Sequence, residues 1–316
     1  MISIVIPCYN EEAVIPVLYE RLSSAVGHLP DSYEVVVVDD GSIDASWDLL
    51  TEISLRDQRW KIIRFSRNFG HQAALSAALF HAKGDCAVLI DADLQDPPEA
   101  IGRFIEKWKE GFQVVYAVRA KRKENIFKRA LYKIFYLLLA SVANIQIPLD
   151  SGDFCLIDRK VIDLLNKMPE QNMFIRGVRA WVGFKQIGVV YERSARAAGE
   201  PKYTYRKLFK LAVDGIFSFS TLPLRITTYF GFIVATFAFL FGFLTLIQRI
   251  FIDFSAKLGI APVPGFATTV TAIFFMGGIQ LICVGIVGEY IGRIYEQVKG
   301  RPVWIISEKN GFDERQ

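Results

Sequence analysis

The stretch LIDADLQDPPEA crowds four carboxylates into nine residues: Asp91, Asp93, Asp96 and Glu99. Like charges at this density repel, so each carboxylate needs either a cation or a hydrogen-bonded role of its own. Asp91 and Asp93 directly follow an apolar run, and residues two apart in an extended segment point the same way. Two carboxylates on one side of a strand end suit Mg²⁺ or Mn²⁺, which take their remaining ligands from water and substrate phosphates.

The other two carboxylates are predicted to be structural. Asp is a favoured residue before a helix, and Pro is favoured at the first helical position. Asp96 is followed by two prolines and, three positions later, by Glu99. This spacing resembles a capping box that starts a helix over 99–110.

An α/β fold is expected to position these residues. Apolar runs of strand length lie at 2–6, 35–38, 61–65, 87–90 and 114–118. Helical stretches alternate with them at 14–26, 45–53, 72–83 and 99–110. Continuous apolar strands alternating with helices predict a mostly parallel sheet covered by helices, with a ligand site at the carboxyl ends of the strands.

Polar and charged residues follow four of the predicted strands and should converge on that edge: Tyr9, Asn10, Glu11 and Glu12; Asp39, Asp40, Gly41 and Ser42; Asp91 and Asp93; and Arg119. The first turn has neither GxGxxG nor GxxxxGK[ST], which argues against a Rossmann dinucleotide site and a P-loop. Acidic loops favour a metal together with a nucleotide.

The last third of the chain predicts two membrane spans. The 316 residues are 52% hydrophobic and carry a net charge of only +4. No charged residue lies between Arg225 and Arg249, and a second uncharged stretch runs from Leu258 to Gly288. Helices over about 226–249 and 267–289 would be long enough to cross a bilayer. Basic residues precede the first span and follow the second, so both termini are expected in the cytoplasm and the short connecting loop outside.

These motifs together resemble glycosyltransferase family 2, the inverting nucleotide-sugar transferases with a GT-A fold. The matching segments are VIPCYNEE (5–12), VVVDDGSIDAS (36–46) and LIDADLQDPPE (89–99). The later segments resemble its polyprenyl-phosphate hexosyltransferases, which include bactoprenol glucosyltransferases and dolichyl-phosphate mannosyltransferases: YAVRAKR (116–122), SGDFCLIDR (151–159), AGEPKYTYRKL (198–208) and FSTLPLR (219–225). The resemblance extends to about Gly300. One departure is Pro201, where these relatives usually carry Ser, and it puts the local role of Lys202 in doubt.

The resemblance implies a role for each matching residue. Asp91 and Asp93 would hold Mg²⁺ or Mn²⁺ against the diphosphate, with Gln95 as a further ligand. Asp153, Asp93 and Arg119 would be catalytic, and Asp153 would either act as a base or orient the acceptor, with Asp150 as its weaker rival. The nucleotide-sugar pocket would be lined by Pro7, Tyr9, Glu11, Asp39, Asp40, Ser42 and Asp91.

A lipid phosphate acceptor requires cations near a membrane. Amphipathic helices near 124–144 and 204–219 carry basic residues suited to a membrane interface. Because these charges lie beside membrane spans, they argue against a nucleic-acid partner. The residues expected to bind the lipid phosphate are Arg119, Arg122, Lys128, Arg129, Arg196 and Lys202.

The sequence thus predicts a GT-A catalytic domain over 1–224, two spans within 225–292 and a cytoplasmic tail over 293–316. It favours transfer of glucose from UDP-glucose to undecaprenyl phosphate at the bacterial inner membrane, for cell-envelope glycosylation. Other sugars remain alternatives (mannose, galactose, GlcNAc or aminoarabinose), as do a non-catalytic scaffold and a processive synthase. The relatives also imply a homo-oligomer, with a tetramer as one form.

Overall fold

The computed structural model describes residues 1–119, 151–168, 175–191, 222–250 and 265–312. The chain divides into two compact units. One comprises Met1–Phe219 together with Arg301–Gln316, and the other comprises Ser220–Gly300.

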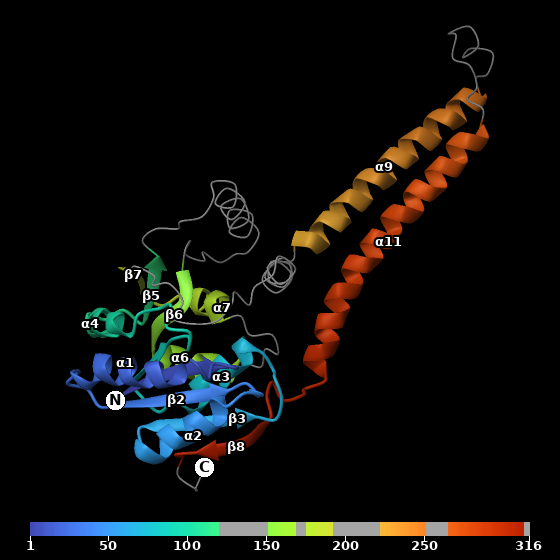
Figure 1. Cartoon of the computed structure of the whole chain (residues 1–316). Helices are drawn as coiled ribbons and strands as arrows, with labels where there is room; N and C mark the ends of the chain where they lie inside the picture. Colours follow the sequence, from blue (N-terminus) through green and yellow to red (C-terminus); the bar gives the residue numbers. More distant parts are fainter. Residues whose placement is uncertain (120–150, 169–174, 192–221, 251–264, 313–316) are drawn as a thin grey trace. The chain divides into compact units, whose positions relative to one another are not determined.

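The first unit is built on a sheet whose described strands follow the order β7-β5-β6-β4-β1-β2-β3-β8 (Figure 1). Its parallel centre comprises β1 (Ile2–Cys8), β2 (Tyr33–Asp39), β3 (Trp60–Phe65) and β4 (Cys86–Leu89). All residues of β1 and β4 are buried. The continuous apolar runs therefore form the doubly covered strands that the sequence predicted.

Helices cover both faces of this sheet. Alternate residues of β2 face opposite layers, because Val35 and Val37 belong to one buried cluster whereas Val36 and Val38 belong to the other. The first cluster includes α1 (Ile15–Gly27), α2 (Ser46–Arg56) and α4 (Ile101–Lys109). The second includes α3 (His71–His81), α6 (Arg159–Lys167) and α7 (Ile175–Trp181).

The flanking strands make the sheet mixed. β6 (Ser151–Asp158) is antiparallel to both β4 and β5 (Val114–Arg119). β7 (Gln186–Tyr191) is parallel to β5, and β8 (Ile306–Asn310) is antiparallel to β3. Residues expected in the terminal tail thus contribute an edge strand to the first unit.

The acidic stretch starts its helix differently from the prediction. A 3-10 turn, η1 (Pro98–Ala100), precedes α4, and neither element has a side-chain cap at its start. The predicted capping box is therefore wrong, because Pro97 is extended and separates Asp96 from the first turn. Both carboxylates nevertheless have structural partners: the Tyr191 hydroxyl donates to Asp96, and Glu99 pairs with Arg21 at 2.8 Å.

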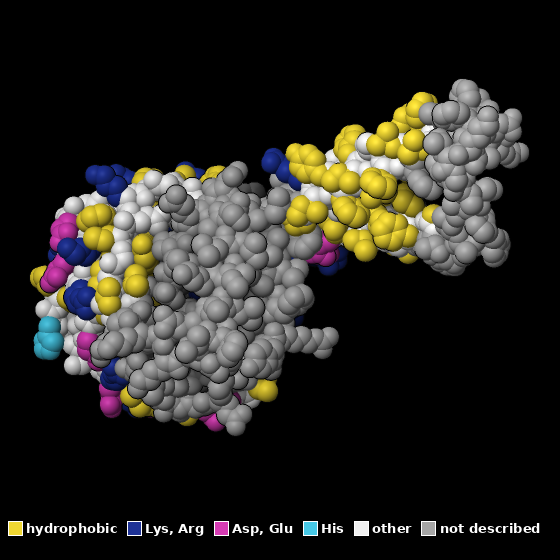
Figure 2. Space-filling model, turned by 90° about the horizontal axis from the view of Figure 1, so that it is seen from above, with side chains coloured by type: hydrophobic (Ala, Val, Ile, Leu, Met, Phe, Trp, Pro, Cys, Tyr) yellow, Lys and Arg dark blue, Asp and Glu magenta, His cyan; other side chains and the backbone are white. Residues whose placement is uncertain are grey.

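The second unit contains α9 (Leu222–Ile250) and α11 (Gly265–Val298), which contact each other. Within them, Pro223–Leu240 and Phe275–Val298 are long and apolar enough to cross a membrane, with mean hydropathies of 1.4 and 1.5. Figure 2 shows hydrophobic side chains exposed along the described parts of both helices. Length and composition therefore agree with the two predicted spans.

Candidate active site

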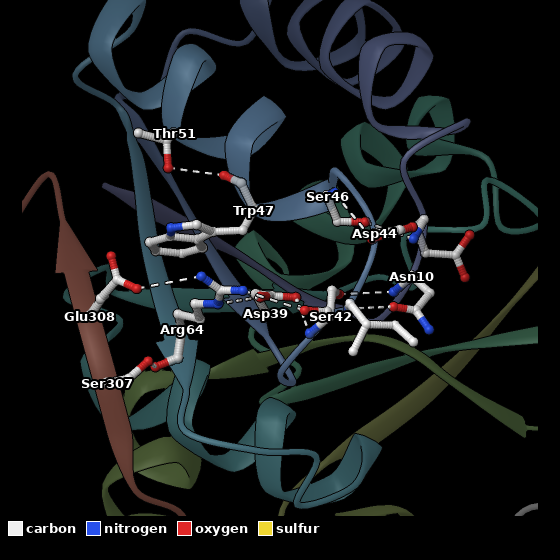
Figure 3. Close-up of polar contacts among 12 residues, drawn as sticks. Asn10, Asp39, Ser42, Asp44, Ser46, Trp47, Thr51, Arg64, Ser307 and Glu308 are labelled. Carbon is white, nitrogen blue, oxygen red and sulfur yellow. Dashed lines mark hydrogen bonds and ion pairs between the residues drawn. The ribbon is translucent and has the colours of Figure 1, made fainter.

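The loops after β1 and β2 are joined by side-chain hydrogen bonds (Figure 3). The Asn10 backbone N–H donates to Ser42 Oγ at 2.9 Å, and the Ile43 N–H donates to Asn10 Oδ1 at 3.0 Å. Asn10 has a φ of 53°, a left-handed conformation that Asn tolerates better than most residues. The Glu11 N–H also donates to Ser46 Oγ at 2.9 Å. These bonds bring the predicted residues Glu11 and Ser42 to one loop cluster.

Asp39 ends β2 and is fully buried. Its Oδ1 accepts from the Ser42 N–H at 3.2 Å, and its Oδ2 lies 3.5 Å from Arg64 Nε. Among the described residues, Oδ2 has no hydrogen-bond partner. Burial raises the pKa of Asp39, although the bonds from Ser42 and the charge of Arg64 oppose the rise. A buried acceptor with an unmet oxygen is a suitable contact for an N–H or O–H of a ligand.

Asp40 has a structural partner on the next loop. Its carboxylate accepts from the backbone N–H of Phe69 at 2.6 Å and of Gly70 at 2.9 Å. Burial raises the pKa of Asp40 against these two backbone bonds. Gly70 has a φ of +102°, which favours glycine. Asp40 therefore fixes the backbone that leads into α3.

Two further predicted pocket residues lie on β1 and directly after it. Pro7 is within β1 and is buried, whereas Tyr9 is 36% exposed. Tyr9 is thus partly accessible at this edge of the sheet, whereas Pro7 is not.

Asp91 and Asp93 follow β4, as predicted. Asp91 Oδ1 lies 2.9 Å from His71 Nε2, and the side chain of Asp91 is 32% exposed. Asp93 is buried, and its Oδ1 accepts from the Gln95 N–H at 3.1 Å. Leu94, between Asp93 and Gln95, has a φ of 55°, and this left-handed conformation turns the chain sharply. Burial alone would lower the pKa of His71, but the bond to Asp91 and the charges of Asp91 and Asp153 raise it to about 9.

Asp153 lies on β6, and a bidentate ion pair holds it. Arg176 Nε donates to Oδ1 at 2.6 Å and Arg176 Nη2 donates to Oδ2 at 2.7 Å. Burial would raise the pKa of Asp153, but the Arg176 guanidinium lowers it well below the usual range. β6 pairs antiparallel with β4, Leu89 opposite Cys155. Continuing this register brings Asp91 opposite Asp153, at the same edge of the sheet.

Comparison with known proteins identifies the fold family of this site. The family model described as glycosyl transferase family 2 matches residues 3–165. The uncharacterized glycosyltransferase YkcC of Bacillus subtilis is 46% identical over 315 residues, which cover 99% of this chain and 95% of the relative. The chain belongs to glycosyltransferase family 2. Its mixed sheet, covered by helices, is accordingly the GT-A fold that the sequence predicted.

The similarity of this family 2 glycosyltransferase to its relatives includes the apolar helices. A model described as the GtrB C-terminal hairpin matches residues 222–294. The bactoprenol glucosyl transferase of Shigella phage SfII is 40% identical over 310 residues, which cover 98% of each chain. A solved structure of the Pyrobaculum calidifontis mannosyltransferase PcManGT with GDP-Man and Mn²⁺ has a TM-score of 0.46 at 16% identity, over 92% of this chain and 86% of that one. At that score and identity, the structural likeness adds nothing to the assignment.

The oxygen ligands that the glycosyltransferase offers at this site fit a hard divalent cation that takes its remaining ligands from a substrate. Asp91 and Asp93 provide carboxylate oxygens, and Gln95 lies half-buried beside them. Within the described ranges, no group of three or more His, Cys, Asp or Glu residues could hold a metal ion. A cation at this loop would therefore need further oxygens from a diphosphate.

Several predicted residues of the glycosyltransferase cannot be placed. Arg119 ends β5, but its side chain is outside the described part of the structure. The two amphipathic helices, the rival Asp150 and the remaining candidates for lipid-phosphate binding also lie outside the described residues: Arg122, Lys128, Arg129, Arg196 and Lys202. Their roles stay predictions.

The structure adds residues that sequence reasoning missed. His71 contacts Asp91, Arg176 holds Asp153, and Arg64 lies beside Asp39. Arg179 is buried, donates to the Gly152 carbonyl at 3.1 Å, and lies over the Tyr116 ring. One available signal for His71 was its position directly after Phe69-Gly70, between a strand and a predicted helix.

Proposed function

We propose that this family 2 enzyme transfers a hexose, with glucose from UDP-glucose as the first candidate, to a polyprenyl phosphate such as undecaprenyl phosphate. The 40% identity to bactoprenol glucosyl transferase over 98% of both chains carries this proposal. It includes both the catalytic unit and the apolar hairpin. A lipid acceptor also gives a reason for joining a sugar-nucleotide fold to two membrane-length helices.

The donor half of the proposed site is formed by the loops after β1, β2 and β4. Asp39 Oδ2, which has no hydrogen-bond partner among the described residues, is suited to an N–H or hydroxyl of the nucleoside, with Tyr9 partly exposed on the preceding loop. Asp91 and Asp93, with Gln95, would hold Mg²⁺ or Mn²⁺ against the diphosphate. Such a cation, when bound, supplies Lewis-acid stabilisation to the leaving diphosphate.

The acceptor half is formed by Asp153 and Arg176. A lipid phosphate is anionic at neutral pH, so its oxygen can attack the anomeric carbon without a strong base. The low pKa of Asp153 makes it a weak base. The paired carboxylate therefore favours the second of its two predicted roles, orienting the acceptor, which places the attacking oxygen in line with the bond that breaks.

We place the reaction at the cytoplasmic face of the bacterial inner membrane, with α9 and α11 as the spans and the connecting loop outside. The charge distribution of the sequence supports this orientation. The homo-oligomer implied by the resemblance stays a prediction.

Purified protein, radiolabelled nucleotide sugars, Mg²⁺ or Mn²⁺ and undecaprenyl phosphate provide the direct test. We expect labelled lipid with UDP-glucose, and label from a different donor would identify the alternative sugar. No labelled lipid with any donor would overturn the proposal.

Asp91→Asn should lower transfer by at least about a hundredfold. The control Asp163→Asn changes a carboxylate whose side chain is 54% exposed on α6 and should retain full transfer.

A further inference from the structure

Three consecutive residues, Gly70 before α3 and the first two residues of α3, contact three different segments of the site. Gly70 donates to Asp40, the side chain of His71 contacts Asp91, and Gln72 accepts from Ile175. We propose that His71 is a positioning residue for the metal-binding Asp91, and that Gln72 couples it to the helix that holds Asp153. This inference rests on the proposed function, since it assigns supporting residues to that site.

The contact of His71 with Asp91 sets which carboxylate oxygen is available. Nε2 lies 2.9 Å from Oδ1, a short hydrogen-bond distance. This bond occupies one oxygen and restricts the rotation of the carboxylate. Oδ2 would then be the oxygen that faces the cation. A residue that orients a ligand in this way commonly changes metal affinity ten- to a hundredfold when it is removed.

The orientation of Gln72 determines the tautomer of His71. Its Oε1 accepts from the Ile175 N–H at 3.1 Å, so its Nε2 is the amide atom that lies 3.3 Å from His71 Nδ1. Reversing the amide would leave the Ile175 N–H facing a donor. Nδ1 therefore accepts, and Nε2–H donates to Asp91. The Nε2–H donor is also present in the imidazolium, so the contact with Asp91 does not depend on the charge of the ring.

Ile175 is the first residue of α7, and its N–H is one of the donors that a helix leaves unsatisfied at its start. Gln72 supplies the acceptor. The next residue, Arg176, forms the two bonds to Asp153. A single side chain on α3 thus connects the donor half of the site to the acceptor half.

The experiment measures Mn²⁺ binding in the presence of UDP by the electron paramagnetic resonance of free Mn²⁺, so that it needs neither sugar nor lipid. We expect His71→Leu to weaken binding about ten- to a hundredfold. His71→Gln, whose amide can still donate to Asp91, should restore affinity to within about threefold. The matched control is His81→Gln at the other end of α3, where Nδ1 contacts the Ala77 carbonyl. It should bind Mn²⁺ like the wild type.

Gln72→Met tests the coupling. Its kcat for transfer should fall about tenfold, with a smaller change in Mn²⁺ affinity, because it affects α7 more directly than Asp91. Unchanged Mn²⁺ affinity in His71→Leu, or unchanged kcat in Gln72→Met, overturns the corresponding half of the inference. If His71→Leu does not fold, His71→Asn replaces it, because the shorter amide does not reach Asp91.

These outcomes are separable from those of the proposed function. A wild-type protein that binds Mn²⁺ with UDP but labels no lipid refutes the proposed acceptor and leaves the inference standing. A wild-type protein that transfers sugar without binding Mn²⁺ refutes the inference and supports the proposed transfer.

Discussion

The buried carboxylates of this protein differ in their hydrogen-bond and ion-pair partners. Glu34 pairs with Lys61 at 2.6 Å and accepts from Ser3 Oγ and the Lys83 N–H. Asp40 accepts only backbone donors in the bonds described above. Asp39 Oδ2 has no hydrogen-bond partner among the residues that the structure describes, although it lies 3.5 Å from Arg64 Nε. Residue type alone cannot separate these cases, because a carboxylate's partners come from other parts of the chain. The carboxylate with an unmet oxygen is the better candidate for a ligand contact.

Asp153→Asn should greatly reduce both transfer and stability. The change leaves Arg176 without its anion, and removing one partner of a buried ion pair costs about 3 kcal/mol. Loss of acceptor orientation should lower kcat by about a hundredfold. Denaturant unfolding and the labelled-lipid assay measure the two effects. A variant with wild-type kcat would show that Asp153 has no part in the reaction.

The contacts of Glu34 predict that its contribution to the free energy of unfolding is lost at acid pH. Burial raises its pKa, but the bonds from Lys61, Ser3 and Lys83 outweigh burial and lower it below the ordinary value of 4.5. The folded pKa is depressed, so the stabilisation is present above pH 4.5 and is lost as the pH falls through the folded pKa. Glu34→Gln should cost about 2 kcal/mol at pH 7. The cost should shrink below pH 4.5 in denaturant titrations, and a constant cost across this range would contradict the assignment.

At the scale of elements, the sequence predicted β1 to β5 and missed β6, β7 and β8. β1 to β5 are apolar runs, and their predicted bounds agree with the structure within two residues. β8 has the sequence ISEKN, which has no apolar run and no alternation. It forms because its backbone pairs with the edge of β3. The two strands are far apart in the sequence: Ser307 of β8 donates to the carbonyl of Arg64 in β3, 243 residues earlier. Local pattern contains no signal for such a pairing.

The candidate site was predictable only in part for the same reason. Asp91 and Asp93 follow a predicted strand, so topology brings them to its edge. Asp153 was expected from the family resemblance alone, because the sequence did not predict β6. A role for His71 or Arg176 can be assigned only from the partner that each contacts on another element. These partners are Asp91 and Asp153, which lie 20 and 23 residues away.

The segment before β8 should contribute to stability through Trp304. Its ring stacks on Phe65 at 6.4 Å and lies 6.3 Å from Phe80. Trp304→Ala should cost about 2 kcal/mol, because it removes these ring contacts and buried apolar area. The matched control is Ile305→Ala, whose side chain is 53% exposed, and it should cost under about 0.5 kcal/mol. Thermal unfolding of the two variants in one detergent compares them, and equal losses would show that the rings contribute nothing.

At the scale of the whole molecule, the chain joins a polar catalytic unit to a helical unit with exposed apolar side chains. An exposed apolar surface of this kind is unfavourable in water. The helical unit therefore needs a lipid environment or a protein partner, and its hydropathy and length favour lipid.

The predicted topology can be tested with single cysteines in a cysteine-free chain. A cysteine at Ser255, in the predicted outer loop, should react with a membrane-impermeant maleimide in intact spheroplasts. A cysteine at Ser307, in β8, should react only after the membrane is opened. Labelling of Ser307→Cys in intact spheroplasts, or protection of Ser255→Cys, would contradict the orientation.

The position of β8 in the chain has a consequence for the order of synthesis. β8 follows α11, so the outer edge of β3 stays unpaired until both apolar helices have left the ribosome. The Arg64 guanidinium beside Asp39 likewise gains its neighbour Glu308 only then. The surroundings of Arg64, beside the proposed donor site, are thus completed only after the helices expected to enter the membrane. A chain arrested at that stage exposes an open β edge, the kind of surface that promotes aggregation.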